Sequence, residues 1–176
     1  MNKTKMHHRL NSGMPLYKEN NVGSHKPNQQ PYQLTDFPIQ TFDKIRYADT
    51  DRQGHVNNAA FSTYLETGRV EFLYDPKDPL ANENCEFVIA SLHLNFLGEI
   101  TWPGRLDIGT GVTRVGTSSF GLYQVLFQDE VCVATAETTI VQMDVSSRKS
   151  APLGDATRHY LNDHLFVKGV DAKGMN

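Results

Sequence analysis

The sequence predicts an α+β domain in which one helix covers an antiparallel sheet. One segment, residues 57–75, repeats apolar residues at every third or fourth position, and four later segments alternate apolar and polar residues with a period of two. The first period is that of a helix with one buried face, and the second is that of strands. A chain of 176 residues is long enough for one such core.

The first 35 residues are rich in Asn, Gln, Lys, His and Pro and show no sustained apolar period. Such a composition cannot offset the entropy of ordering, so we expect residues 1–35 to form a flexible arm before a domain at 36–165, with 166–176 as a C-terminal tail. A first strand is expected within 37–49, where Ile39 and Ile45 stand among polar residues.

The helix is expected to begin with Asn57 or Asn58 as its N-cap, because asparagine accepts well from the first free N–H groups. Its buried stripe consists of Phe61, Tyr64, Leu65, Gly68 and Phe72. The polar, proline-containing run "PKDPLANEN" then ends it and predicts a surface loop.

Four strands are expected at 85–100, 104–116, 118–129 and 130–144, meandering antiparallel, with a tight hairpin at "DE" (129–130). The buried faces are expected to hold Val88, Ala90, Leu92, Leu94 and Phe96 in the first strand and Leu106, Ile108 and Val112 in the second. The third strand is apolar on both faces, so a second subunit is expected as its further cover. A short helix is expected in "LGDATRHYLNDHLF".

Composition excludes several classes of protein. A formal charge of -3 and a pI near 6.1 give no field that would attract nucleic acid or an anionic membrane. Cys85 and Cys132 are too few and too far apart for a disulfide framework or a four-ligand zinc site, and we expect them reduced. The sequence has neither a membrane-spanning apolar run nor the apolar core of a signal peptide, so we expect a cytoplasmic protein. The five Lys or Arg against one acid in residues 1–35 leave a cleaved transit peptide as the alternative.

The glycine pair in "IGTGVTRVG", Gly109 and Gly111, is not a dinucleotide fingerprint, because it lies inside an alternating strand and the third glycine before a helix is missing.

The polar stretch "YADTDRQGHVNN", residues 47–58, has three possible readings. As a calcium loop it places Asp49 first, but the twelfth position is Ala60 instead of the glutamate that completes the shell, and a strand precedes it, which excludes calcium. As a catalytic loop it places Asp51 and His55 ahead of a helix N-terminus, whose free N–H groups can stabilise an oxyanion. As an ordinary polar turn it would use Asp51 only as a cap.

The stretch "RYADTDRQGHVNNAAFSTYLETGRVEFL" resembles the helix entry of hotdog-fold acyl-CoA thioesterases of the 4-hydroxybenzoyl-CoA thioesterase family, whose pattern is roughly Y-x-D-x-D-x-x-G-H-V-N-N-x-x-Y-x-x-Y-x-E-x-x-R. Tyr64, Glu66 and Arg69 match that pattern, whereas Phe61 replaces its first later tyrosine. The similarity covers roughly residues 38–153. It implies a long central helix wrapped by a five- to six-stranded sheet.

The resemblance assigns roles to the loop. Asp51 would be the nucleophile or general base, the backbone N–H of Asn58 the oxyanion donor, and His55 a helper whose role stays open. Gly54 would let the loop approach the substrate, while Asp49 would be structural. An ion pair between Glu66 and Arg69 would position the helix.

Acyl-CoA is the implied substrate, hydrolysed to the free acid and CoA without a metal or nucleotide cofactor. Phe61, Leu65 and Phe120 would line the acyl pocket, and Arg114 would meet CoA phosphates. The family pairs its subunits with active sites at the interface, which implies a homodimer or a dimer of dimers. A hotdog dehydratase and a non-catalytic acyl-CoA-binding protein remain alternatives, as does an acyl carrier protein in place of CoA.

Overall fold

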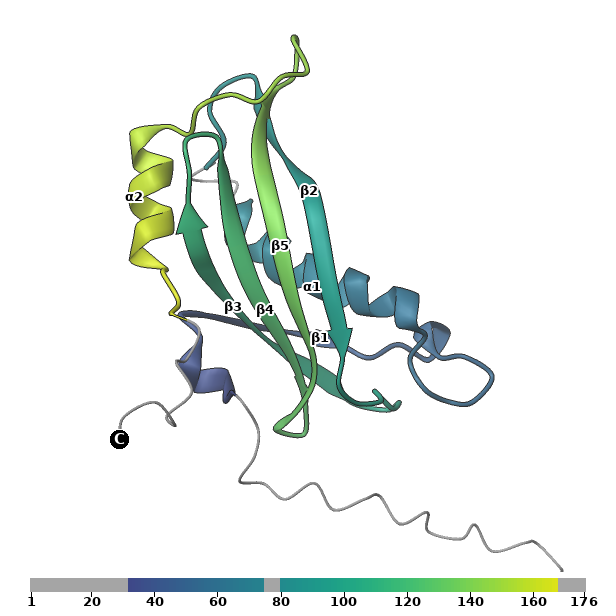
Figure 1. The fold of residues 1–176 in the computed structure, drawn as a ribbon. Coiled ribbons are helices and arrows are strands. Elements are labelled where there is room, and N and C mark those ends of the chain that lie inside the picture. The colour runs from purple at the N-terminus through teal and green to yellow at the C-terminus, as the bar shows by residue number, and fades with distance from the viewer. Residues whose placement is uncertain (1–31, 75–79, 168–176) are drawn as a thin grey trace, which may run out of the picture.

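The computed structural model describes residues 32–74 and 80–167, and within these ranges five strands form one antiparallel sheet beside two α-helices (Figure 1). The strands are β1 (Ile39–Lys44), β2 (Cys85–Phe96), β3 (Arg105–Val115), β4 (Ser119–Gln128) and β5 (Val131–Asp144). The helices are α1 (Asn58–Leu73) and α2 (Asp155–Asp163), and two 3₁₀ turns, η1 (Leu34–Asp36) and η2 (Tyr47–Asp49), precede α1 in the chain. The fold class is therefore the predicted one.

Helix α1 begins where the sequence predicted. The side chain of its N-cap, Asn57, accepts a hydrogen bond of 2.9 Å from the Ala59 N–H. The whole predicted stripe is buried, together with Arg69 and Leu73. Helix α1 packs chiefly on β1, β3 and β4, and the sheet curves around it (Figure 1). A long helix wrapped by an antiparallel sheet is the hotdog fold.

The strand order, β1-β3-β4-β5-β2, corrects the predicted meander. Strands β3, β4 and β5 do follow one another, and β4 turns into β5 through Asp129 and Glu130, whose φ angles of 50° and 65° suit a tight hairpin. Strand β2, however, pairs with β5 at the sheet's edge and not with β3. Alternation identifies strands but not their partners.

The face predicted for β2 is wrong in its first half. The pairing register shifts between Ile89 and Ser91, as at a β-bulge. Phe87 and Ile89 stand opposite the buried Gln142 and Ile140 of β5, where strict alternation placed Val88 and Ala90, whereas Leu92 beyond the shift lies on the predicted face, opposite Thr138. This face is also less covered than predicted, since Ile89 is 50% exposed and Phe96 is 49% exposed.

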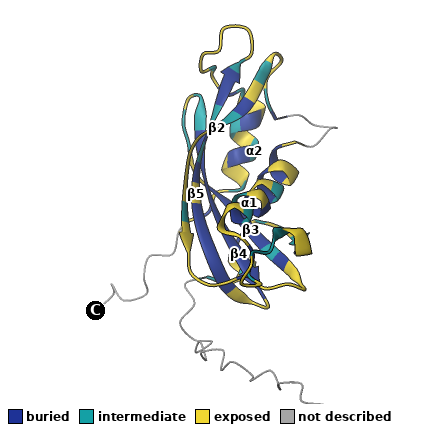
Figure 2. Ribbon diagram, turned by 90° about the vertical axis from the view of Figure 1, so that its right-hand side faces the viewer, coloured by how far each residue is buried: buried dark blue, intermediate teal, exposed yellow. Residues whose placement is uncertain are grey.

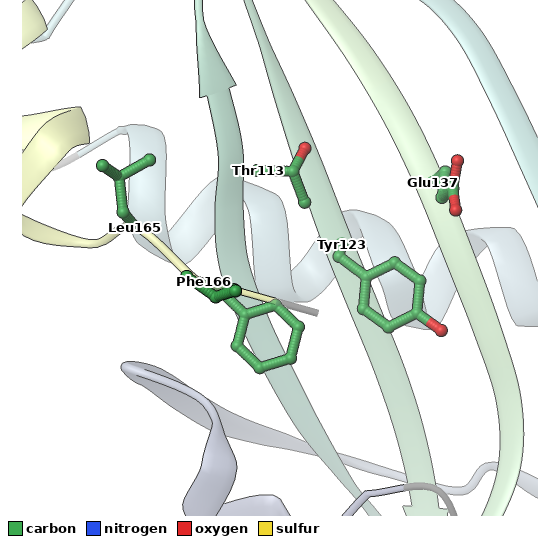
Figure 3. A pocket seen from close by; sticks show the side chains of 6 residues that line it. Thr113, Tyr123, Glu137, Leu165 and Phe166 are labelled. Atoms are coloured by element: carbon green, nitrogen blue, oxygen red, sulfur yellow. The ribbon is translucent and has the colours of Figure 1, made fainter. Parts of the chain in front are cut away.

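Strand β4 is buried on both faces, as predicted, but its second cover belongs to the same chain (Figure 2). On the face away from α1, Tyr123 and Phe127 contact Phe37 from the N-terminal segment, and Phe166 stacks on both Phe37 and Tyr123. Tyr32 completes the cluster. Figure 3 shows Phe166 beside Tyr123 on the outer surface of the sheet. Both terminal segments thus contribute cover to this face from within the same chain.

The glycine pair of β3 explains how these segments fit. A Cβ on Gly109 would come within 2.5 Å of the Phe37 ring, and a Cβ on Gly111 would overlap Phe166. Two backbone hydrogen bonds, Val112 N–H to His164 O and Phe166 N–H to Val112 O, hold the C-terminal segment there. The pair is therefore a packing feature of the outer face.

The described boundaries refine the predicted domain. Tyr32 and Leu34, from the predicted arm, and Phe166, from the predicted tail, all belong to the outer cluster. The rest of the arm and tail lies outside the described residues. Helix α2 confirms the predicted C-terminal helix, and its Tyr160 stacks on Phe72 near the end of α1.

Both cysteines are free thiols. Cys132 is buried in the outer cluster, and this burial raises the pKa of its thiol to about 11, so it stays protonated and unreactive at neutral pH.

Candidate active site

The loop between β1 and α1 is closed by its own backbone. The Asp51 N–H donates to the His55 carbonyl at 2.8 Å, and the Gly54 N–H donates to the Asp51 carbonyl at 3.1 Å. The Val56 N–H donates to the Ile100 carbonyl at 2.8 Å, which fixes the loop to the connection between β2 and β3. Asp51 and His55 are therefore held at the base of one tight turn, directly before the helix.

The carboxylate of Asp51 has one oxygen engaged in this turn. Its Oδ1 accepts hydrogen bonds from the Gln53 N–H at 2.7 Å and the His55 N–H at 3.4 Å. Within the described ranges, Oδ2 makes no hydrogen bond. The reading of Asp51 as a turn cap is thus correct for one oxygen, and the other is free for chemistry.

Gly54 has a φ of +86°, a conformation that costs any residue with a side chain. A Cβ at this position would meet nothing within 4 Å. The turn therefore requires glycine because of its backbone angle, and not because a neighbouring group would collide with a side chain.

The first N–H groups of α1 differ in their partners. The Ala59 N–H donates to the Asn57 side chain and the Ala60 N–H to the Asn57 carbonyl. For the Asn58 N–H, the described part of the chain offers no hydrogen-bond acceptor. This free donor lies at the positive end of the helix dipole, where an oxyanion is favoured.

Asp49 is structural, as the resemblance implied. Its Oδ2 accepts from the Tyr64 hydroxyl at 2.6 Å and from Nε of Arg46 at 2.9 Å, and its carbonyl accepts from the Asn57 N–H at 2.8 Å. Burial raises the pKa of Asp49, but the bonds from Tyr64 and Arg46 outweigh this and leave that pKa below its ordinary value. Burial, followed by the bond to Asp49, strongly raises the pKa of Tyr64. This cluster joins the loop to α1.

The imidazole of His55 faces Glu99, a residue that the sequence did not single out. Nε2 of His55 lies 3.3 Å from the Glu99 carboxylate, while only the His55 backbone contacts Asp51. Glu99 precedes Ile100 in the β2–β3 connection, and its nearness follows from the pairing of His55 with Thr101. Since no local pattern encodes that pairing, sequence spacing could not reveal Glu99.

The structure brings only some of the predicted substrate residues to the loop. Phe61 and Leu65 lie on the first turns of α1 in one core cluster with Val56 and Ile100. Phe120 does not join them: it packs with Phe72 near the other end of α1. Arg114 stands near the far end of β3, roughly 30 Å along the strand from Arg105. Neither Phe120 nor Arg114 is thus positioned beside the loop.

The expected ion pair between Glu66 and Arg69 is not present among the described ion pairs. Arg69 is buried, and its Nη1 donates instead to the side-chain oxygen of Gln124 on β4 at 3.1 Å. The Gln124 amide in turn donates to the Leu65 carbonyl and to Thr110. Arg69 therefore attaches α1 to the sheet through a glutamine, which a pattern along the helix could not show.

A hollow of about 460 Å³ lies away from the loop, on the outer face of the sheet (Figure 3). Thr113, Tyr123, Glu137, Leu165, Phe166 and Val167 line it.

Comparison with known families decides the identity of the chain. Residues 45–161 match the model of the thioesterase-like superfamily. The chain belongs to this superfamily. The match includes both the loop with Asp51 and the connection with Glu99. It also spans all of α1 and the four longest strands.

Relatives of this thioesterase-like chain include a protein named as an acyl-CoA thioesterase and several solved structures. Acyl-CoA thioesterase YbgC of Helicobacter pylori is 30% identical over 93 residues, which cover 53% of this chain and 67% of that protein. A solved structure of a predicted thioesterase from Bacillus stearothermophilus is 25% identical, with a TM-score of 0.66 over 72% of this chain and 96% of the other. A thioesterase from Thermus thermophilus, solved with coenzyme A and zinc, is 26% identical, with a TM-score of 0.63 over 73% of this chain and 94% of the other.

Proposed function

We propose that this member of the thioesterase-like superfamily hydrolyses an acyl-CoA thioester to the free acid and CoA. One observation carries the proposal: a single loop presents Oδ2 of Asp51 and leads into the Asn58 N–H, and neither group has a hydrogen-bond partner among the described residues. The names of the relatives, an acyl-CoA thioesterase and a thioesterase crystallised with coenzyme A, support the same reaction.

In the proposed reaction the thioester carbonyl oxygen accepts the Asn58 N–H, and the helix dipole stabilises the negative charge that builds up during addition. Asp51 either attacks the carbonyl carbon to give an anhydride, which water then cleaves, or removes a proton from the attacking water. In both routes the C–S bond breaks, water supplies the hydroxyl of the acid, and the thiolate of CoA takes up a proton.

His55 is the proposed proton donor to the departing thiolate. The Glu99 carboxylate lies 3.3 Å from Nε2 and orients the imidazole. Glu99 acts through His55 and is a positioning residue. Because a thiolate leaves readily even without a proton, this assistance adds less than the oxyanion site.

The acyl group is proposed to lie along the first turns of α1. Phe61 and Leu65 form its wall, and the Phe61 ring packs edge-to-face on Phe96 of β2 at 5.0 Å between centroids. Phe61 brings no hydroxyl to this wall, so an apolar acyl group suits it better than a hydroxylated one.

A second copy of the chain is the proposed partner, docked on the free edge of β2. Within residues 32–74 and 80–167 this strand of 12 residues pairs on one side only, and Ile89, Leu92 and Phe96 leave apolar surface exposed beside that edge. An exposed apolar edge strand favours pairing with another strand. Since the terminal segments cover the outer face, we propose a dimer, not a dimer of dimers joined through that face.

No helix in the described ranges is both long and apolar enough to cross a bilayer. A cytoplasmic location is proposed on the composition of the chain.

The test is a panel of acyl-CoAs with short branched, aromatic and medium-chain acyl groups, assayed for release of free thiol. Turnover of at least one of them is expected. Hydration of a crotonyl-type thioester without thiol release would replace the proposal by the dehydratase. Binding of acyl-CoA without any reaction would replace it by the non-catalytic binding protein. Acyl carrier protein thioesters in the same assay identify the carrier.

A further inference from the structure

The only tryptophan of the chain, Trp102, stands beside the proposed catalytic loop. Its neighbour Thr101 pairs with His55 across an isolated β-bridge. The Gln128 side chain fixes Thr101 on both sides, accepting from its N–H at 2.9 Å and donating to its carbonyl at 2.7 Å. The position of Trp102 relative to His55 is therefore set by hydrogen bonds and not by burial of the indole.

Trp102 forms an exposed aromatic pair with Tyr47. The two ring centroids are 5.4 Å apart, and the planes meet at 75°. Tyr47 begins the turn that leads to Asp49, and its carbonyl accepts from both the N–H and the hydroxyl of Thr50. Tyr47 is 73% exposed and Trp102 is 48% exposed. Two large aromatic side chains that are exposed to solvent, on backbone that is fixed by hydrogen bonds, are typical of a contact surface for a ligand.

The location of the pair indicates which part of a thioester it meets. The acyl group is apolar and is accommodated next to the buried Phe61, whereas the thiol carrier has to reach solvent. The pair is exposed, and Trp102 is one residue from the bridge partner of His55. The group nearest to the sulfur in CoA is the pantetheine arm, a long extended chain, so the nucleotide lies much farther from the loop.

The charges around the pair are mixed, since the exposed Arg46 and Arg105 flank it as well as Glu99, so charge alone does not select the nucleotide phosphates over the neutral arm. Glu99, 71% exposed, lies on the same connection, three residues before Trp102, and its carboxylate would repel a phosphate. The pantetheine arm carries no charge. Its methyl groups and amides pack well on aromatic rings, and a tyrosine hydroxyl can bond an amide.

We propose that Tyr47 and Trp102 form the subsite for the pantetheine arm of the thioester substrate. This inference rests on the proposed thioesterase function, and it adds two substrate-contacting residues on the carrier side of the thioester. It also makes substrate selection depend on the arm itself, which CoA and acyl carrier protein share.

The first experiment uses the fluorescence of Trp102, which reports on this place alone because the chain has no other tryptophan. Pantetheine, CoA and adenosine 3′,5′-bisphosphate are each titrated into the wild-type protein. Pantetheine and CoA are expected to change the indole emission, while the bisphosphate, which lacks the arm, is expected to leave it unchanged. An unchanged emission with CoA at concentrations that inhibit turnover would overturn the proposal, and so would a full response to the bisphosphate alone.

The second experiment compares Trp102→Ala with Trp102→Phe, using an acyl-CoA and the matching acyl-N-acetylcysteamine thioester, which keeps the end of the arm next to sulfur. Trp102→Ala is expected to raise KM about tenfold, with kcat little changed, since a lost aromatic contact is worth about 1.4 kcal/mol. Trp102→Phe is expected to recover most of that loss. Unaltered KM in Trp102→Ala, with normal thiol release, would refute the subsite and leave the function standing. A fluorescence response without thiol release from any thioester would instead refute the hydrolysis and keep the subsite.

Discussion

The Tyr64 hydroxyl donates a hydrogen bond of 2.6 Å to Oδ2 of Asp49, and this bond joins helix α1 to the turn in front of the proposed catalytic loop. Asp51 and Asn58 lie between these two residues in the sequence. The bond therefore fixes the segment that holds both the carboxylate and the oxyanion donor.

Replacing Tyr64 by phenylalanine removes this bond and leaves the ring packed in the core. The free energy of unfolding is expected to fall by about 2 kcal/mol, the value of a hydrogen bond to a charged group. The loss should depend on pH. The pKa of Asp49 is lowered in the folded protein. The stabilisation that ionised Asp49 gives the folded protein is therefore complete above the ordinary pKa of 3.8 and is lost as the pH falls through the lowered pKa. Urea unfolding of the wild type and of Tyr64→Phe, at pH 7 and below pH 3, measures the difference in their free energies of unfolding. The same difference at both pH values would contradict the role of Asp49.

A double-mutant cycle tests whether Glu99 acts through His55. Glu99→Gln removes the charge beside the imidazole, and kcat is expected to fall through misplacement of His55, by less than the loss of an oxyanion donor would cause. In a His55→Ala background the same change is expected to have no further effect on kcat. Steady-state kinetics of the wild type, the two single variants and the double variant measure the four kcat values that the cycle compares. Additive losses would show that Glu99 has a role independent of His55.

The close packing of Phe166 on Gly111 predicts that one added methyl group destabilises the outer face. Gly111→Ala places a Cβ against Phe166, so the C-terminal segment has to move, at a cost of about 1–3 kcal/mol typical of overpacking. Gly98→Ala is the matched control, because its Cβ would meet Val133 at an ordinary 3.5 Å. Thermal unfolding of the three proteins is the measurement. Equal stability of Gly111→Ala and wild type would show that the terminal cover contributes little.

The proposed interface predicts a change of assembly. Leu92→Lys puts a charge on the apolar face of β2, and size-exclusion chromatography with light scattering is expected to show a monomer where the wild type is a dimer. Val131→Lys, at another half-exposed apolar position, is the control and is expected to stay dimeric. A dimer in both variants would place the interface elsewhere.

Much of the fold could be predicted because the evidence for it is local. The N-cap at Asn57, the buried stripe from Phe61 to Phe72 and the two faces of β4 depend on residues within one element, and all are confirmed. The pairing of β2 with β5 and the bulge at Ala90 depend on contacts between distant segments, and here the predictions were wrong.

The same distinction applies to the site. Asp51 and Gly54 belong to one loop, and Asn58 begins the helix directly after it, so all three could be proposed as site residues from one continuous segment. Glu99 and Trp102 reach that loop only because Thr101 pairs with His55, which no spacing in the sequence encodes. Phe120 was named for its apolar character, and the structure places it in the cluster at the other end of α1.

Thiol release from an acyl-CoA by the Asp51→Asn variant tests the proposed function most directly. Asparagine keeps the side-chain oxygen that caps the turn through Gln53, so the loop is expected to retain its shape, as a wild-type melting temperature would show. It can neither attack a thioester nor accept a proton from water, and kcat is expected to fall by about a hundredfold or more. Thiol release at the wild-type rate would contradict the assignment of Asp51 as the residue that carries the reaction.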